Sequence, residues 1–135
     1  MNYNINASSI AKQDAAILIK KSEIDFGTTV KTTDSLPNPA ELFLGSFASC
    51  ILKNVERFSN LMKFSYTKAT IDVNSTRLEN PPRMENLIYN LTIYTNDKKL
   101  NIALLKKNIE KHGTIYNTIK LSCNISGTIK MIQHV

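Results

Sequence analysis

Two kinds of hydrophobic spacing predict strands and helices along the chain. Residues 15–20 and 22–26 are short β-rich runs separated by polar residues and ending before Gly27, which predicts an N-terminal set of antiparallel strands. From Asn38 to about Lys63 the apolar residues recur with helical spacing, which predicts a helix of about seven turns. Because this helix is long for a chain of 135 residues, we expect it to be central to the fold.

The start of this helix is defined by three residues. Asn38 is a favourable N-cap, and Pro39 suits the first helical position because it has no backbone N–H to satisfy. Glu41 follows three residues after the cap, where its carboxylate can accept a hydrogen bond from the backbone N–H of the cap residue. The pattern therefore predicts a capping box.

The second half of the chain combines strands with one further helix. Alternating apolar residues over 69–73 and 87–93, on either side of Asn80-Pro81-Pro82, predict an antiparallel hairpin with one buried face. A helix is expected over 101–112 and should end at Gly113. The final strand is expected to place five apolar residues on one face: Leu121, Cys123, Ile125, Ile129 and Met131. This order predicts a single α+β domain over residues 1–135.

Composition and charge exclude several classes of function. The chain is 42% hydrophobic and 21% charged, as expected of a globular domain, and its net charge is +6. The lysines are spread as short pairs without interleaved aromatic residues, so nucleic-acid binding is not expected. No apolar run reaches the roughly 18 residues that would span a membrane, and the N-terminus does not resemble a signal peptide. We expect a soluble, cytoplasmic protein.

Cysteine usage points to a reducing compartment and leaves the role of Cys50 open. The two cysteines have neither paired spacing nor a histidine cluster, so no metal is expected. Cys50 lies on the border between the apolar and polar faces of the long helix. Its polar-side neighbours are Ser46, Lys53, Asn54 and Arg57. It is either a packed hydrophobic residue or a reactive centre.

A reactive cysteine in the middle of a helix requires a positive charge from elsewhere. Only the thiolate is nucleophilic, and the helix dipole helps little away from the N-terminus. Lys53, Arg57, or Lys20 or Lys21 from the N-terminal strands could supply this charge. Gly45, with the serines beside it, forms a seam of small residues that either admits a second backbone or is simply a tolerated weak helix former. Together with the modest chain length, this seam predicts a homodimer.

Residues 37–50, Pro-Asn-Pro-Ala-Glu-Leu-Phe-Leu-Gly-Ser-Phe-Ala-Ser-Cys, resemble the cysteine-bearing helix of the osmotically inducible protein C and organic hydroperoxide resistance (OsmC/Ohr) family. The order of the later hairpin, helix and strand agrees over nearly the whole chain. The resemblance implies a two-layer α+β fold and an intertwined homodimer with active sites at the subunit interface. It also implies reduction of organic hydroperoxides by a cysteine pair with a dithiol reductant, and no cofactor is expected.

The chain departs from the family pattern at several positions. The family carries its second, resolving cysteine near the end of the second helix, commonly followed by proline, where this chain has Gly113 and Thr114. Cys123 comes about ten residues later and is either a displaced resolving cysteine or a core residue. The family also uses an arginine from the N-terminal strands, whereas the first arginine here is Arg57. Hydroperoxide resistance members carry glutamate where this chain has Ala40.

The leading hypothesis is a one-cysteine, peroxiredoxin-like thiol peroxidase. Cys50 would attack the O–O bond of a hydroperoxide and be restored by an external thiol. Glu41 is the second candidate catalytic residue, although capping is the stronger interpretation of its position. The candidate substrate-binding residues are Phe43, Phe47, Lys53 and Arg57. The alternatives are a redox sensor that uses Cys50 and a non-catalytic binding or structural dimer of the same fold.

Overall fold

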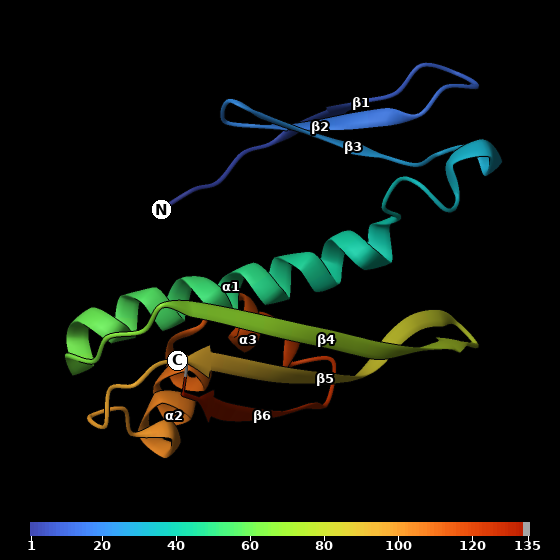
Figure 1. Ribbon diagram of the computed structural model, residues 1–135. Helices are drawn as coiled ribbons and strands as arrows, with labels where there is room; N and C mark the ends of the chain where they lie inside the picture. The colour runs from blue at the N-terminus through green and yellow to red at the C-terminus, as the bar shows by residue number, and fades with distance from the viewer. Residues whose placement is uncertain (134–135) are drawn as a thin grey trace. The chain divides into compact units, whose positions relative to one another are not determined.

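A computed structural model describes residues 1–133 and confirms the predicted α+β fold (Figure 1). The chain divides into two compact units, Met1–Phe43 and Leu44–Val135. The long helix α1, Pro39–Met62, begins in the first unit and continues through the second. No helix of residues 1–133 is both long and apolar enough to cross a membrane.

The first unit is a three-stranded antiparallel sheet followed by a turn. Its strands are β1 (Asn6–Ser8), β2 (Ala15–Ile19) and β3 (Ser22–Phe26), paired in the order β1-β2-β3. The sequence predicted β2 and β3 but not the short β1. The carboxylate of Asp14 accepts hydrogen bonds from the Thr28 and Thr29 backbone N–H groups and from the Thr32 hydroxyl. These bonds attach the 3₁₀ turn η1 (Val30–Thr32) to the start of β2.

The capping box at the start of α1 is confirmed. The Asn38 side-chain oxygen accepts from the Glu41 N–H at 2.8 Å, and Glu41 Oε1 accepts from the Asn38 N–H at 3.1 Å. Two backbone donors that the helix leaves without partners are thereby satisfied. The sequence defined this helix to within one residue at each end.

The second unit is a three-stranded sheet with three helices. Strands β4 (Lys68–Glu79) and β5 (Pro82–Tyr94) form the predicted antiparallel hairpin, which turns at Asn80-Pro81. Helix α2 (Ile102–His112) ends at Gly113 as predicted, and the short helix α3 (Thr114–Ile119) follows it. Strand β6 (Ile125–Ile132) then pairs with β5 in parallel, so α2 and α3 form the crossover between two parallel strands.

One prediction for the final strand is wrong. β6 begins at Ile125, whereas Leu121 and Cys123 lie in the turn between α3 and β6. Leu121 is 85% exposed, so it does not contribute to the apolar face. The alternation of apolar residues continued backwards through this turn and gave no sign of where the strand begins.

The helices cover the face of the sheet on which Tyr89 lies. The Tyr89 ring is 5.8 Å from that of Phe47 on α1, and its hydroxyl donates to Glu110 on α2. Phe47 also packs against Tyr116 of α3, with ring centroids 6.0 Å apart. The predicted inner face of β5 is confirmed as buried. The buried apolar residues of this unit are Phe47, Ile51, Val55, Phe58, Phe64, Leu87, Tyr89, Leu91, Ile93, Leu105, Ile109, Tyr116 and Ile119.

Candidate functional site

Cys50 lies at the middle of α1 and is a half-buried free thiol. Asn54, one turn later, is buried, and its Nδ2 atom donates to the Cys50 backbone oxygen at 3.0 Å. The same Nδ2 lies 3.7 Å from Sγ of Cys50, within hydrogen-bonding range of sulfur. An amide donor is therefore held beside the sulfur.

Gly113 is the residue that faces Cys50 from the crossover. A β-carbon placed on Gly113 would lie 3.3 Å from Sγ of Cys50, and 3.0 Å from both Ile109 O and Tyr116 Cβ. The position that the resemblance assigned to the resolving cysteine is therefore adjacent to Cys50 in space. In this chain a buried glycine occupies it, and it offers no sulfur.

Cys123 has different surroundings. Its Sγ donates to the backbone oxygen of Met84 at 3.3 Å and lies 4.0 Å from the Ser122 hydroxyl. Both cysteines are free thiols. Cys123 therefore lies in a turn attached to β5, not on the inward face of the last strand as expected from the sequence.

The predicted cations do not contact the sulfur. Within residues 1–133 neither Lys53 nor Arg57 forms an ion pair or a hydrogen bond with Cys50. Lys53 is exposed, and the Arg57 guanidinium lies over the Phe58 ring, 5.4 Å from its centroid. Lys20 and Lys21 lie at the turn between β2 and β3 of the first unit.

The two candidate phenylalanines differ in their accessibility. Phe47 is fully buried and packs against Tyr89 and Tyr116. It therefore has no surface open to a substrate. Phe43 is half-buried and is the last residue of the first unit. Phe47 is thus part of the core beneath Cys50 rather than part of an open pocket.

The sequence did not predict the polar network formed by Tyr89, Glu110 and Lys106 beside Phe47. The carboxylate of Glu110 accepts from the Tyr89 hydroxyl at 2.7 Å and from Lys106 Nζ at 2.9 Å. Burial, together with this carboxylate, raises the pKa values of Tyr89 and Tyr116. Both hydroxyls therefore stay protonated, and that of Tyr89 donates to Glu110. The Lys106/Glu110 spacing could have predicted the ion pair, but nothing local pairs Glu110 with Tyr89.

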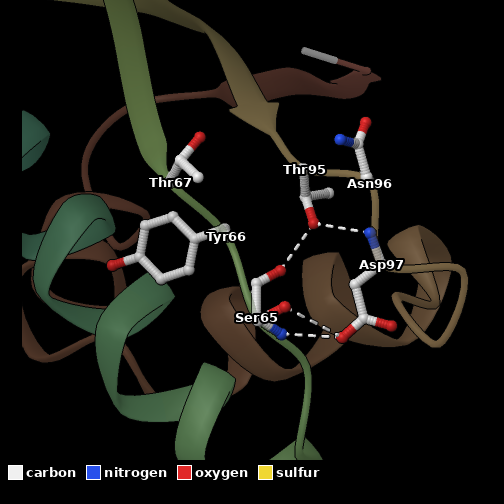
Figure 2. Close-up of a pocket in the computed structure, with 6 residues that line it drawn as sticks. All are labelled: Ser65, Tyr66, Thr67, Thr95, Asn96 and Asp97. Carbon is white, nitrogen blue, oxygen red and sulfur yellow. Dashed lines mark hydrogen bonds between the residues drawn. The ribbon is translucent and has the colours of Figure 1, made fainter. Parts of the chain in front are cut away.

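A hollow lies between the segment that follows α1 and the loop after β5 (Figure 2). Its volume is about 380 Å³, and it is lined by Ser65, Tyr66, Thr67, Thr95, Asn96 and Asp97. The Asp97 carboxylate accepts from the Ser65 N–H, and the Thr95 hydroxyl donates to the Ser65 backbone oxygen. The backbone N–H groups of Lys99 and Ser65 lower the pKa of Asp97. These bonds hold the loop together, so we assign the hollow a structural role.

Comparison with known proteins identifies the family. The sequence model of the family described as OsmC-like protein matches residues 32–127, which is most of the chain. The chain belongs to the OsmC-like protein family. No curated protein matches it in sequence.

Solved OsmC-like structures confirm the fold at low sequence identity. The OsmC-like protein of Mycoplasma pneumoniae superposes with a TM-score of 0.87 and 16% identity, covering 98% of both chains. A hypothetical protein of Aquifex aeolicus gives a TM-score of 0.81 at 16% identity, over 100% of this chain and 99% of that one. An organic hydroperoxide resistance protein of Elizabethkingia anophelis gives 0.67 at 15% identity, over 99% of both. The OsmC-like fold therefore extends over nearly the whole chain.

Within residues 1–133, no group of three or more His, Cys, Asp or Glu side chains could hold a metal ion. The chemistry that the site offers is that of one accessible sulfur with one amide donor, next to a backbone position without a side chain.

The position of Glu41 leads to a prediction that separates capping from catalysis. Glu41→Gln removes the charge but keeps a side-chain oxygen that can accept from the Asn38 N–H. We expect the free energy of unfolding in urea to change by less than about 0.5 kcal/mol and the oxidation rate of Cys50 to stay unchanged. A tenfold or greater loss of the oxidation rate at unchanged stability would instead make Glu41 a catalytic residue.

Proposed function

We propose that this chain is a one-cysteine OsmC-like thiol peroxidase that reduces organic hydroperoxides in the reducing cytoplasm. The Cys50 thiolate attacks one oxygen of the O–O bond and becomes a sulfenic acid, and the other oxygen leaves as an alkoxide that takes up a proton. A thiol from solution then condenses with the sulfenic acid to a mixed disulfide and releases water. A second thiol displaces Cys50 and leaves with the first as a disulfide.

One observation carries this proposal: the free Cys50 sulfur faces Gly113, at the place where a second cysteine would have to stand. The likeness of the fold to organic hydroperoxide resistance proteins supports the choice of oxidant. The absence of a thiol at residue 113 supports an external reductant. The amide of Asn54 gives the Cys50 sulfur a hydrogen-bond donor at 3.7 Å.

Two alternatives share parts of this arrangement. A redox sensor would use the same oxidation of Cys50 without rapid turnover, and a chain lacking a sulfur at residue 113 suits that role. A non-catalytic binding dimer would keep Cys50 as packing, which agrees with the absence of a cation in contact with the sulfur within residues 1–133.

The decisive experiment follows the oxidation state of Cys50. Reduced Cys123→Ser protein is mixed with cumene hydroperoxide or with hydrogen peroxide, and intact mass is recorded over time, with and without an added thiol. We expect rapid gain of one oxygen atom, faster with cumene hydroperoxide, and repeated turnover when the thiol is present. Cys50→Ser is the control and should gain none. Oxidation without turnover would indicate a sensor, and an inert Cys50 would leave the binding dimer.

We further propose that residues 1–135 act as one OsmC-like domain in a homodimer. The first unit contains a three-stranded sheet with a single buried apolar residue, Ala15, among its strands, and such a sheet needs further burial to be stable. We therefore expect light scattering at micromolar concentration to give the mass of two chains. A monomer at that concentration would exclude an active site shared between subunits.

A further inference from the structure

Cys50 shares one side of α1 with a cation. At about 100° per residue, Asn54 and Arg57 follow Cys50 within roughly 40° of the same line along the helix. Seven residues separate Cys50 from Arg57, which corresponds to roughly 10 Å along the axis. Lys53 lies on the neighbouring line and is exposed. The surface that runs from the thiol along the helix is therefore positively charged.

The end of α2 adds a second polar group to this surface. The Phe58 ring is buried, and it contacts both the Arg57 guanidinium, at 5.4 Å, and the His112 ring, at 5.6 Å between centroids. Arg57 and His112 are both exposed. His112 directly precedes Gly113, the residue that faces the Cys50 sulfur. The thiol, the imidazole and the guanidinium thus lie along one junction between α1 and the end of α2.

The acidic side chains of these two helices are occupied elsewhere. The Glu56 carboxylate accepts from the Tyr66 hydroxyl, and the Glu110 carboxylate binds Tyr89 and Lys106. The ion pairs within residues 1–133 are Arg77–Glu79 and Lys106–Glu110. Arg57 therefore has no acidic partner in the described part of the chain, and its donors remain available to an anion from solution.

We infer that Arg57 and His112 bind a carboxylate of the thiol that restores Cys50, so that the reductant is a small anionic thiol. This inference rests on the proposed function. The thiol loses its proton and attacks the sulfenic sulfur of Cys50, and hydroxide leaves with that proton as water. The carboxylate meanwhile forms an ion pair with Arg57 and accepts a hydrogen bond from a ring N–H of His112.

The missing cysteine explains why the thiol needs such a contact. A resolving cysteine at residue 113 would be held beside Cys50 by the backbone, whereas a thiol from solution must be oriented by binding. Gly113 itself offers no side chain for this purpose.

The first arm of the test measures the reductive step. Cys50 of Cys123→Ser protein is converted to the sulfenic acid and reduced with glutathione or with its dimethyl ester, which lacks the carboxylate charges. We expect the reduction rate with glutathione, divided by the rate with the dimethyl ester, to fall roughly threefold to tenfold in the Arg57→Gln/His112→Asn variant. Arg77→Gln removes the same charge from β4, away from this junction, and should leave the ratio unchanged. Equal ratios in all three proteins would overturn the inference.

The second arm does not depend on peroxidase activity. Reduced Cys50 is alkylated with iodoacetate, which is anionic, and with iodoacetamide, which is neutral. We expect the alkylation rate with iodoacetate, divided by the rate with iodoacetamide, to fall severalfold in the Arg57→Gln/His112→Asn variant and in 0.5 M salt. If Cys50 proves inert to hydroperoxides but the iodoacetate-to-iodoacetamide ratio falls in the variant, the anion site is supported and the peroxidase proposal fails. If Cys50 turns over with hydroperoxides but the ratio is the same in parent and variant, only the anion site is contradicted.

A third comparison distinguishes the thiol from the oxidant as the source of the carboxylate. The rate of Cys50 oxidation is measured with a hydroperoxide that carries a carboxylate and with its methyl ester. We expect the ratio of these rates to be the same in the parent and in the Arg57→Gln/His112→Asn variant. If this oxidation ratio falls in the variant while the reduction ratio does not, the anion site binds the hydroperoxide, and its assignment to the reductant is overturned.

Discussion

Gly127→Ala is expected to lower the free energy of unfolding by roughly 3 kcal/mol or more. A β-carbon on Gly127 would lie 2.0 to 2.3 Å from three ring atoms of Tyr89, which is fully buried. Gly127 pairs with Tyr89 in the parallel ladder of β5 and β6, so the ring crosses directly over it. The ring cannot move away, because Phe47 packs against it and Glu110 holds its hydroxyl. Urea unfolding followed by circular dichroism measures the loss.

Gly45→Ala is the matched control for this prediction. Gly45 lies within α1, and a β-carbon there would have no atom within 4 Å. We expect this change to stabilise the protein by up to about 1 kcal/mol, since alanine is the better helix former. Adding Tyr89→Leu to Gly127→Ala should recover part of the lost stability by removing the clash. Equal effects of the two glycine substitutions would contradict the assigned contact with Tyr89.

Gly113→Cys is expected to convert the site into a two-cysteine centre. The introduced β-carbon would lie 3.3 Å from Sγ of Cys50, close to the separation found across a disulfide. After oxidation by a hydroperoxide, the sulfenic acid of Cys50 should condense with the new thiol, with loss of water. The product would lack two hydrogens, resist iodoacetamide, and be restored by dithiothreitol. Intact mass and peptide mapping in a Cys123→Ser background detect this bond.

The same substitution carries a steric cost that its control measures. The new β-carbon would also lie 3.0 Å from Ile109 O and from Tyr116 Cβ, so we expect a loss of about 1 kcal/mol of stability. Gly113→Ser has a similar size without a thiol and should show the same loss but no cross-link. A Gly113→Cys variant in which Cys50 accumulates as the sulfenic acid while the new thiol stays free would show that the two positions cannot meet.

The parts of the fold that are encoded locally could be predicted from the sequence. Asn38, Pro39 and Glu41 define the start of α1 through contacts within four residues, and the alternation over 87–93 identifies the buried face of β5. The direction and partner of β6 could not be predicted, because its neighbour β5 lies more than thirty residues earlier in sequence. Cys123 was misplaced for the same reason, since its contact with Met84 is not local.

The candidate site was partly accessible to sequence reasoning. Cys50 was singled out by its place on the long helix, the missing cysteine at Gly113 came from the resemblance to the OsmC/Ohr family, and the structure places the two residues side by side. Helical spacing placed Arg57 on the side of Cys50, but it could not show that the guanidinium lies over Phe58 beside His112. Such contacts join residues of two helices, and neither helix shows them in its own pattern.

From the parallel pairing of β5 with β6 we also expect an order in which the thiol site is assembled. The β4–β5 hairpin is contiguous in sequence and closes a short loop, whereas β6 joins the sheet only after the chain has passed through α2 and α3. Gly113 belongs to that crossover, so we expect the wall facing Cys50 to be completed late in folding. Detachment of β6 would loosen this wall before the hairpin opens. Cys50 should therefore become accessible to alkylation in parallel with amide exchange in β6, ahead of exchange in the β4–β5 hairpin.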